Sequence, residues 1–474
     1  MSLDSFANWL DTSAEWIIGM VILIGLAQNL VALIQLVVAS ATLRKADSHD
    51  TKEALWQRAA PGSTPIALIA PAYNEAHTIV DSLKSLLGLH YPYFEVIVVN
   101  DGSKDATLEK LREHFELTPA AHAYEEVAPH QPIRQIYRSG NFKNLIVVDK
   151  VNGGKADSLN AGINIARSPI FCAVDADSLL DTEALLMAAG PFRENPREVI
   201  AVGGVIRIAN GCSIKGGRVR KVALPGKLLP LIQVVEYTRA FLIARVAMSR
   251  LGILTLISGA FGVFNRRAAL AVGGYARDTV GEDYELILRL HRYHLEHQLP
   301  YQIRTVPEPV CWTEAPDNLK TLANQRKRWQ RGALEAFFRH KKMLFNPAYG
   351  KLGIIGMGFS LLVDVLGPLA EALGYILVPV FWFSGVLDTS YALAFLALTF
   401  SFGVFVSAGS MVLEEASLYR IPSAKDLLKI TAVILVENLG YRQLCNIWRI
   451  QGWWQFLRKK QGWGEMARTG FIQS

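Results

Sequence analysis

Five short motifs, spread through the sequence, hold the residue types of one chemistry. Three carry carboxylates beside small residues: Asn100-Asp101-Gly102-Ser103, Asp175-Ala176-Asp177 and Gly281-Glu282-Asp283. The other two, Pro71-Ala72-Tyr73-Asn74-Glu75 and Gln325-Arg326-Lys327-Arg328-Trp329, add aromatic and cationic side chains. Carboxylates can hold a divalent cation or accept a proton, arginine can clamp a diphosphate, and an aromatic ring can stack under a base or sugar. Together the motifs predict a site that binds a metal-bound diphosphate and deprotonates a hydroxyl.

Asp175 and Asp177 are the candidate metal ligands. They flank one small residue directly after the apolar run 170–174, which has the length and composition of a buried strand. Ligands of parallel sheets bind beyond the carboxyl ends of the strands, and carboxylate oxygens there suit Mg²⁺ or Mn²⁺. Asp-x-Asp also occurs in ordinary solvated turns, so the position after this strand is what favours a metal.

Three further motif residues are candidates for holding a nucleotide. Tyr73 and Asp101 follow the predicted strands 66–70 and 94–99, where a ring could stack on a base and a carboxylate could reach the ribose or base. A simple turn and helix cap is the alternative for both. Asn152-Gly153-Gly154-Lys155 places backbone amides and an ammonium at a predicted helix start, which suits an anion. Its spacing is not that of a P-loop, which disfavours an ATPase.

Asp283 is the candidate general base. With Glu282 it begins a predicted helix over 284–293, where the helix N-terminus stabilises carboxylates whether or not they are catalytic. An exposed, preorganised carboxylate at such a position can take the proton from a sugar hydroxyl that attacks an anomeric carbon.

Gln325, Arg328 and Trp329 share one face of a predicted helix. Arginine can clamp a diphosphate and tryptophan can stack under a sugar ring. A juxtamembrane basic cluster would account for the charges, but it would not account for the tryptophan.

Alternating short strands and helices must position these motifs. The expected strands cover 66–70, 94–99, 145–148 and 170–174, and the expected helices cover 75–87, 105–115 and 155–166. This alternation predicts a mostly parallel, doubly wound α/β sheet. A further helical stretch over 229–257 is expected to lie as an amphipathic helix on the inner membrane surface, with an ordinary surface helix as the alternative.

The composition indicates a membrane protein with a sizeable soluble part. Of 474 residues, 51% are hydrophobic and 19% charged, which is few charges for a soluble protein. Residues 17–43, 352–383 and 391–412 are apolar enough to cross a bilayer, whereas 427–447 is weaker. Arg44 and Lys45 follow the first segment, so the next domain is expected in the cytoplasm. The net charge of +7 comes without a zinc pattern or an arginine-rich helix, so no nucleic-acid partner is expected.

The set of motifs resembles that of the membrane-embedded family 2 glycosyltransferases, the inverting processive synthases of cellulose, chitin and hyaluronan. The resemblance spans about residues 60–345 with the flanking membrane segments, and Gln-x-x-Arg-Trp is its most specific motif. It implies a GT-A-like doubly wound nucleotide-binding domain inserted between transmembrane helices. The family often has threonine where this chain has Gly281, and the Phe-x-Val-Thr segment of cellulose synthases is absent, so cellulose is not the expected product.

The resemblance also implies roles for individual residues. Asp283, with Glu282 beside it, would be catalytic, and Asp175 and Asp177 would hold Mg²⁺ or Mn²⁺. The residues implied to bind the UDP-sugar are Tyr73, Glu75, Asp101, Lys155, Asp175, Gln325, Arg328 and Trp329. The implied division of the chain is an N-terminal transmembrane anchor over 1–46, a cytosolic glycosyltransferase domain with amphipathic interface helices over 47–345, C-terminal transmembrane helices over 346–450, and a basic, tryptophan-rich interfacial tail over 451–474.

The expected protein is therefore a multi-pass enzyme of the bacterial inner membrane with its catalytic domain in the cytoplasm. It would pass a sugar from a UDP-sugar to a growing polysaccharide, with or without coupled translocation. Transfer of a single sugar to a lipid-linked acceptor is one alternative, and a non-catalytic membrane scaffold or transporter is another. The expected partners are the UDP-sugar, a polysaccharide or lipid-linked acceptor and the lipid bilayer, and the need for an accessory subunit stays open.

Overall fold

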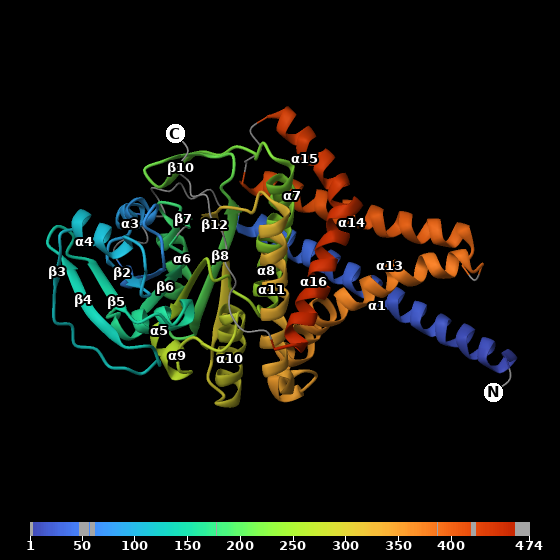
Figure 1. The fold of residues 1–474 in the computed structure, drawn as a ribbon, viewed down its shortest axis with the longest axis horizontal. Helices are drawn as coiled ribbons and strands as arrows, with labels where there is room; N and C mark the ends of the chain where they lie inside the picture. The colour runs from blue at the N-terminus through green and yellow to red at the C-terminus, as the bar shows by residue number, and fades with distance from the viewer. Residues whose placement is uncertain are drawn as a thin grey trace.

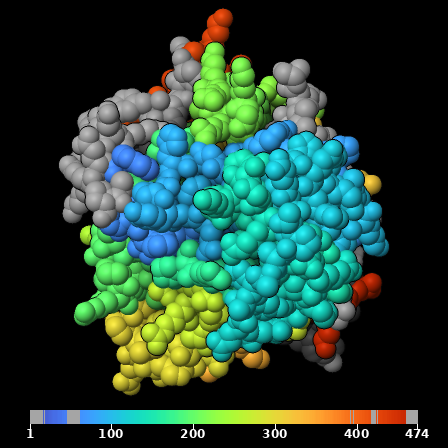
Figure 2. Space-filling model, turned by 90° about the vertical axis from the view of Figure 1, so that its left-hand side faces the viewer, coloured from blue at the N-terminus to red at the C-terminus, as the bar shows by residue number. Residues whose placement is uncertain are grey.

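The computed structural model describes residues 3–46, 56, 62–176, 178–385, 387–418 and 423–459. Figure 1 shows an α/β part at the left and long helices that project to the right. A layer of helices lies between them and runs crosswise to the projecting ones. The face turned away from the projecting helices is built by the first strands and helices of the α/β part, coloured blue to teal in Figure 2, with a green hairpin standing out at its edge.

The α/β part is centred on a ten-stranded sheet with the order β3-β4-β5-β2-β1-β6-β11-β8-β12-β7. A separate hairpin pairs β9 with β10. The strands are β1 Ile66–Ala72, β2 Phe94–Asn100, β3 Leu117–Pro119, β4 Ile133–Ser139, β5 Leu145–Lys150, β6 Ile170–Val174, β7 Leu179–Leu180, β8 Val199–Ile208, β9 Ser213–Lys215, β10 Arg218–Lys221, β11 Phe261–Asn265 and β12 Gln302–Thr313.

The first half of the sheet agrees with the sequence prediction, and the second half differs from it. Strands β1, β2, β5 and β6 begin at the predicted residues and pair in parallel. However, β11 runs antiparallel to β6 and to β8, and β4 runs antiparallel to β5. The sheet is therefore mixed rather than mostly parallel. Strand direction depends on which distant strand is the neighbour, and apolar patterning carries no information about that.

The helices are α1 Leu3–Ala46, α3 Ile79–Leu87, α4 Thr107–His114, α5 Lys155–Ile165, α6 Ala184–Glu194, α7 Leu228–Tyr237, α8 Arg245–Leu251, α9 Arg266–Ala271, α10 Glu282–Glu296, α11 Leu319–Arg339, α12 Met357–Ser360, α13 Gly367–Phe383, α14 Thr389–Leu418, α15 Ala424–Val436 and α16 Arg442–Leu457. Shorter 3-10 turns and π-helical segments are η2 Thr238–Ala244, η3 Lys341–Met343, η4 Pro347–Tyr349, η5 Leu352–Gly356, η6 Leu361–Leu366 and η7 Glu437–Tyr441. Helix α3 begins later than predicted because residues 75–78 form a turn.

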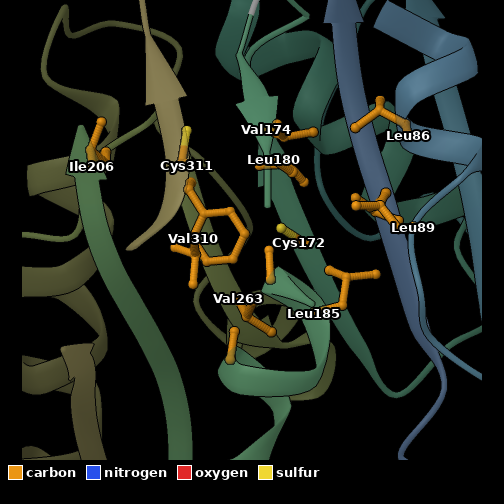
Figure 3. Close-up of a cluster of buried hydrophobic side chains, with 14 of the residues drawn as sticks. Leu86, Leu89, Cys172, Val174, Leu180, Leu185, Ile206, Val263, Val310 and Cys311 are labelled. Atoms are coloured by element: carbon orange, nitrogen blue, oxygen red, sulfur yellow. The ribbon is translucent and has the colours of Figure 1, made fainter. Parts of the chain in front are cut away.

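Both faces of the sheet are buried, and alternate residues of each strand supply the two cores. In β1, Leu68 and Ala70 belong to one buried cluster, whereas Ala67 and Ile69 belong to the other. Figure 3 shows the first cluster, where Cys172 of β6 and Cys311 of β12 lie among apolar side chains. Burial on both sides is why these strands read as continuous apolar runs.

In the described part of the chain, three helices are long and apolar enough to cross a membrane: Gly19–Arg44, Leu352–Phe383 and Ala392–Ala416. They correspond to the three strong segments expected from the sequence. The weaker segment 427–447 is not among the spanning candidates within the described residues. Instead it bends at Leu439 and Gly440, and α16 then runs along α11 (Figure 1). The expected interfacial tail is described only as far as residue 459.

The stretch predicted as an amphipathic helix on the membrane surface forms one continuous rod from α7 through η2 to α8. It packs against the sheet and against α1, and residues such as Val235 and Ala247 are fully buried. Neither a surface helix nor a helix lying only on a bilayer describes it. The charged residues along it, which suggested an exposed face, are in part buried and paired with distant helices.

Two glycines allow α10 and α11 to touch. A Cβ on Gly281 would lie 2.8 Å from the Cα and carbonyl carbon of Gly332, and a Cβ on Gly332 would lie 2.8 Å from the Cα of Gly281. Real Cβ atoms do not approach backbone this closely, so any other residue would push the helices apart. This contact fixes the start of α10 against the middle of α11.

We therefore expect Gly281→Ala to lower the free energy of unfolding by about 1–3 kcal/mol through overpacking, seen as a lower thermal unfolding midpoint. The matched control is Gly190→Ala in α6, where a Cβ would meet nothing within 4 Å. That control should be neutral or up to about 1 kcal/mol stabilising, because alanine is the better helix former. Equal midpoints for the two variants would contradict the close contact.

Candidate active site

A cleft of about 290 Å³ opens between the end of β6, the start of α10 and one face of α11. Its wall includes most of the residues singled out in the sequence: Lys155, Asp175, Glu282, Asp283, Gln325, Arg328 and Trp329. These come from motifs that lie up to about 170 positions apart, and the sheet edge and the α10–α11 contact bring them together.

Lys155 and Asp175 form an ion pair at the floor of the cleft. Lys155 is the first residue of α5, after Gly154, whose φ of +91° favours glycine. Its Nζ lies 2.5 Å from Asp175 Oδ1 and 3.8 Å from Glu282 Oε1. Burial lowers the pKa of the ammonium, but the nearby carboxylates outweigh this effect and raise it overall. The cation therefore stays charged and available to an anionic ligand.

Glu282 is a buried carboxyl group beside this pair. Its side chain is 3% exposed, and Oε2 has no hydrogen-bond partner among the described residues. Burial raises its pKa to about 7, although Lys155 acts in the opposite direction. A carboxyl group with an unpartnered buried oxygen is unusual in a native structure and marks a candidate functional position.

Asp283 is held by two backbone amides. Gly259 N–H donates to its Oδ2 at 2.8 Å, and the amide of Tyr284 donates to Oδ1 at 2.9 Å. Lys155 Nζ donates to the carbonyl of the same Gly259 at 3.0 Å. The Gly259 peptide thus fixes the spacing of the cation and the predicted base. Sequence reasoning missed Gly259, because a single glycine after serine resembles any turn.

The face of α11 forms the opposite wall. Trp329 is 42% exposed, and its ring centroid lies 6.4 Å from that of Tyr237. Tyr237 and Phe241 of the α7–η2 rod complete an aromatic surface that the sequence did not reveal. The linker 314–318 between β12 and α11 lines a further side of the cleft. Such a mixture of rings and polar groups is suited to a sugar.

Three predicted residues lie outside the lining of this cleft. Asp101 is buried, forms an ion pair with Lys150 at 2.5 Å, and accepts hydrogen bonds from the amides of Gly153 and Gly154 at 2.9 and 2.7 Å. It therefore holds the loop that precedes Lys155. Asp101 does not cap the helix that follows it, because α4 begins after Ala106 without a side-chain cap. A direct nucleotide contact of Asp101 stays a prediction.

Tyr73 and Glu75 sit on a neighbouring loop at the same sheet edge. The register of β1 with β2 pairs Ala72 with Asn100, so Tyr73 and Asp101 follow side by side. Tyr73 is 44% exposed, which leaves its ring accessible. The amide of Glu75 donates to Thr107 Oγ1 at 2.9 Å, which anchors the loop. These two residues could serve the nucleotide end of a donor that extends from the cleft.

The predicted metal ligands are Asp175 and Asp177, and Asp177 lies outside the described residues. Among the described residues, no group of three or more His, Cys, Asp or Glu side chains could hold a metal. Mg²⁺ commonly takes one or two carboxylates, with phosphate oxygens and water completing its shell. The oxygen donors of Asp175 and the unpartnered Glu282 Oε2 fit such a cation.

Comparison with known families agrees with this arrangement. Residues 67–236 match the family described as Glycosyl transferase family 2, and residues 170–406 match Glycosyl transferase family group 2. The second match covers half of the chain. Between them they contain every candidate site residue.

Similar proteins point in the same direction. The poly-beta-1,6-N-acetyl-D-glucosamine synthase of Staphylococcus epidermidis is 32% identical over 274 residues, which are 58% of this chain and 56% of that protein. The synthase of the same name from Staphylococcus aureus (strain COL) is 30% identical over 275 residues, with the same two coverages. The chain thus spans about half the length of the curated relatives it matches.

A solved structure shares the fold. The mannosyltransferase PcManGT from Pyrobaculum calidifontis, in complex with GDP-Man and Mn²⁺, superposes with a TM-score of 0.50 at 17% identity. The superposition covers 93% of this chain and 100% of that one.

The raised pKa of Glu282 predicts a pH-dependent stability. Between pH 4.5, the ordinary pKa of glutamate, and about pH 7, Glu282 holds a proton in the folded protein that it releases in the unfolded chain. Raising the pH through this range therefore lowers the free energy of unfolding. Glu282→Gln should remove this pH-dependent loss of unfolding free energy, which is at most about 3 kcal/mol. The measurement is the thermal midpoint from pH 5 to pH 8, with a chelator and without donor. Glu109→Gln, at an exposed position, is the control, and an unchanged profile in Glu282→Gln would contradict the assignment.

Proposed function

Because the chain belongs to glycosyltransferase family 2, we propose that it transfers a sugar from a UDP-sugar to a growing polysaccharide, with inversion at the anomeric carbon. One observation carries the proposal. Asp283, the Lys155–Asp175 ion pair and the Arg328–Trp329 face of α11 line a single cleft, although they come from four separate motifs.

Asp283 is the proposed base. Each of its oxygens accepts one backbone N–H and retains a lone pair for a hydroxyl proton. In the proposed step the acceptor oxygen attacks the anomeric carbon, its proton passes to Asp283, and the bond from that carbon to the phosphate oxygen breaks. UDP then leaves with the electron pair. A single displacement of this kind inverts the centre.

The leaving diphosphate needs positive charge around it. Lys155 and Arg328 would donate to its oxygens, and Asp175 with Asp177 would hold Mg²⁺ or Mn²⁺. When bound, the ion offsets the charge that grows on the leaving group. Glu282, buried beside Lys155, keeps the ammonium oriented. Tyr73, Glu75 and Asp101 are proposed to serve the nucleotide end, Asp101 acting through the loop that it holds.

The proposed product is a polymer of N-acetylglucosamine. The names of the similar synthases from Staphylococcus specify a β-linked polymer of this sugar. Forming a β-linked product from an α-linked UDP-sugar requires inversion. The three apolar helices support a location in the bacterial inner membrane. We propose that Arg44 and Lys45 keep the catalytic domain in the cytoplasm and that the helices pass the polymer outward.

The donor is tested by offering the purified full-length protein, in lipid nanodiscs, a panel of UDP-sugars with Mg²⁺ or Mn²⁺. We expect UDP release with UDP-N-acetylglucosamine to exceed that with other UDP-hexoses by tenfold or more, because a site that hydrogen-bonds a substrate group rejects analogues that lack this group. The products are then sized. A ladder of long chains supports a polysaccharide synthase, and a single sugar on lipid would favour the lipid-acceptor alternative. No metal-dependent UDP release with any sugar would refute glycosyl transfer.

The base is tested by Asp283→Asn. Loss of the proton acceptor should lower turnover by about 10²–10⁴-fold, while UDP still binds, because the diphosphate and nucleotide contacts come from other residues. Turnover is measured as UDP release and binding by calorimetry. The matched control is Asp278→Asn. Asp278 is an exposed aspartate five positions before Asp283, and it pairs with Arg339. Near wild-type turnover in Asp283→Asn would remove Asp283 from this role.

A further inference from the structure

Trp329 does not stand alone on the cleft wall. The guanidinium of Arg326 lies over its ring, 4.3 Å from the centroid. Arg326 is buried, and its Nη2 donates to Glu236 Oε2 at 2.7 Å. A cation held over a tryptophan ring attracts it electrostatically, more strongly when water is excluded. One face of the ring is therefore supported by a buried, paired cation.

Glu236 connects this support to two other elements. It lies on α7 directly before Tyr237, the second ring of the cleft wall. The hydroxyl of Tyr441 also donates to Glu236 Oε2, at 2.9 Å. One oxygen of the Glu236 carboxylate thus accepts hydrogen bonds from Arg326 of α11 and from Tyr441. The next residue along α7 is Tyr237 itself.

The backbone around Tyr441 is shaped for this contact. Leu439 and Gly440 interrupt the helix, and Gly440 has a φ of +99°. The bend returns the chain toward α7 and α11, and Tyr441 is buried there. The contact joins residues that are 205 positions apart.

We propose that Glu236, Arg326 and Tyr441 are positioning residues that fix Trp329 and Tyr237 as a platform for the acceptor sugar. This inference rests on the proposed glycosyl transfer. The three residues do not line the cleft, so they would act only through the rings. A platform that shifts by about 1 Å misplaces the attacking hydroxyl, and such errors can cost up to about 100-fold in rate.

Arg326 uses only part of its hydrogen-bonding capacity. Its Nη2 pairs with Glu236, whereas its Nε is buried without a hydrogen-bond partner in the described part of the chain. The guanidinium is in contact with the ring of Trp329 instead.

A second buried cluster provides the matched control. Glu437 accepts a hydrogen bond from Arg239 at 2.8 Å and also pairs with Arg442. It joins the same rod to the same bent segment, four residues before Tyr441. Neither Glu437 nor Arg239 lines the cleft. A variant here tests stability without touching the proposed platform.

The experiment is a double-mutant cycle of Glu236→Gln and Trp329→Phe in the full-length protein. The probe is UDP-N-acetylglucosamine with Mg²⁺ or Mn²⁺, and the readouts are the donor KM and the mean polymer length at equal UDP release. We expect each single variant to shorten the polymer about tenfold, with the donor KM within about twofold of wild type. The double variant should be no worse than Trp329→Phe alone, because both changes act on one platform.

Further variants make the outcomes decisive. Tyr441→Phe removes one hydroxyl and should shift polymer length in the same direction, whereas Glu437→Gln should leave it unchanged even where it lowers the thermal midpoint. Additive effects in the cycle, a raised donor KM in Glu236→Gln, or equal shortening in Glu437→Gln would overturn the positioning role. Wild-type protein that makes no polymer would instead refute the proposed function, which separates the two failures.

Discussion

The close contact of Gly281 with Gly332 is the constraint on which the site depends. Because neither residue has a side chain, α10 and α11 meet backbone to backbone. Asp283 therefore opens onto the same cleft as Trp329, although the two lie on different helices. The family that the sequence resembles often has threonine at the position of Gly281, but the backbone of Gly332 leaves no room for a side chain there. In this chain the space that a side chain would need at Gly281 is filled by the backbone of α11.

A concentration of charge follows from that geometry. Three carboxylates and one ammonium share the floor of the cleft, and Glu282 has a raised pKa there because burial disfavours its charge. Such an arrangement is costly for a fold and useful for chemistry, because a diphosphate and a cation can replace the internal pairs. The Gly259 residue holds Asp283 and Lys155 at a set distance from each other, since it binds Asp283 through its amide and Lys155 through its carbonyl.

The apolar helices are attached to the catalytic part through buried polar contacts. Tyr284, next to the proposed base, shares a hydrogen bond of 2.5 Å with Ser360 and donates to Asp364 at 3.2 Å. Gln330, next to Trp329, donates to the backbone of Asp364 at 2.6 Å. Both walls of the cleft are therefore tied to residues 360–364 of one candidate membrane-spanning helix, Leu352–Phe383. A change in that helix would reach the base and the aromatic platform together.

The sequence by itself determined the strands β1, β2, β5 and β6, the residues at their carboxyl ends and the three long apolar helices, because periodicity and strand-end chemistry are local properties. Only the tertiary structure decided that Asp101 holds a loop, that Gly259 spaces Lys155 from Asp283, and that a carboxylate from α7 supports a tryptophan on α11. These are contacts between distant segments. Their partners are selected by packing and burial of the whole chain, and a local pattern of residue types carries no record of them.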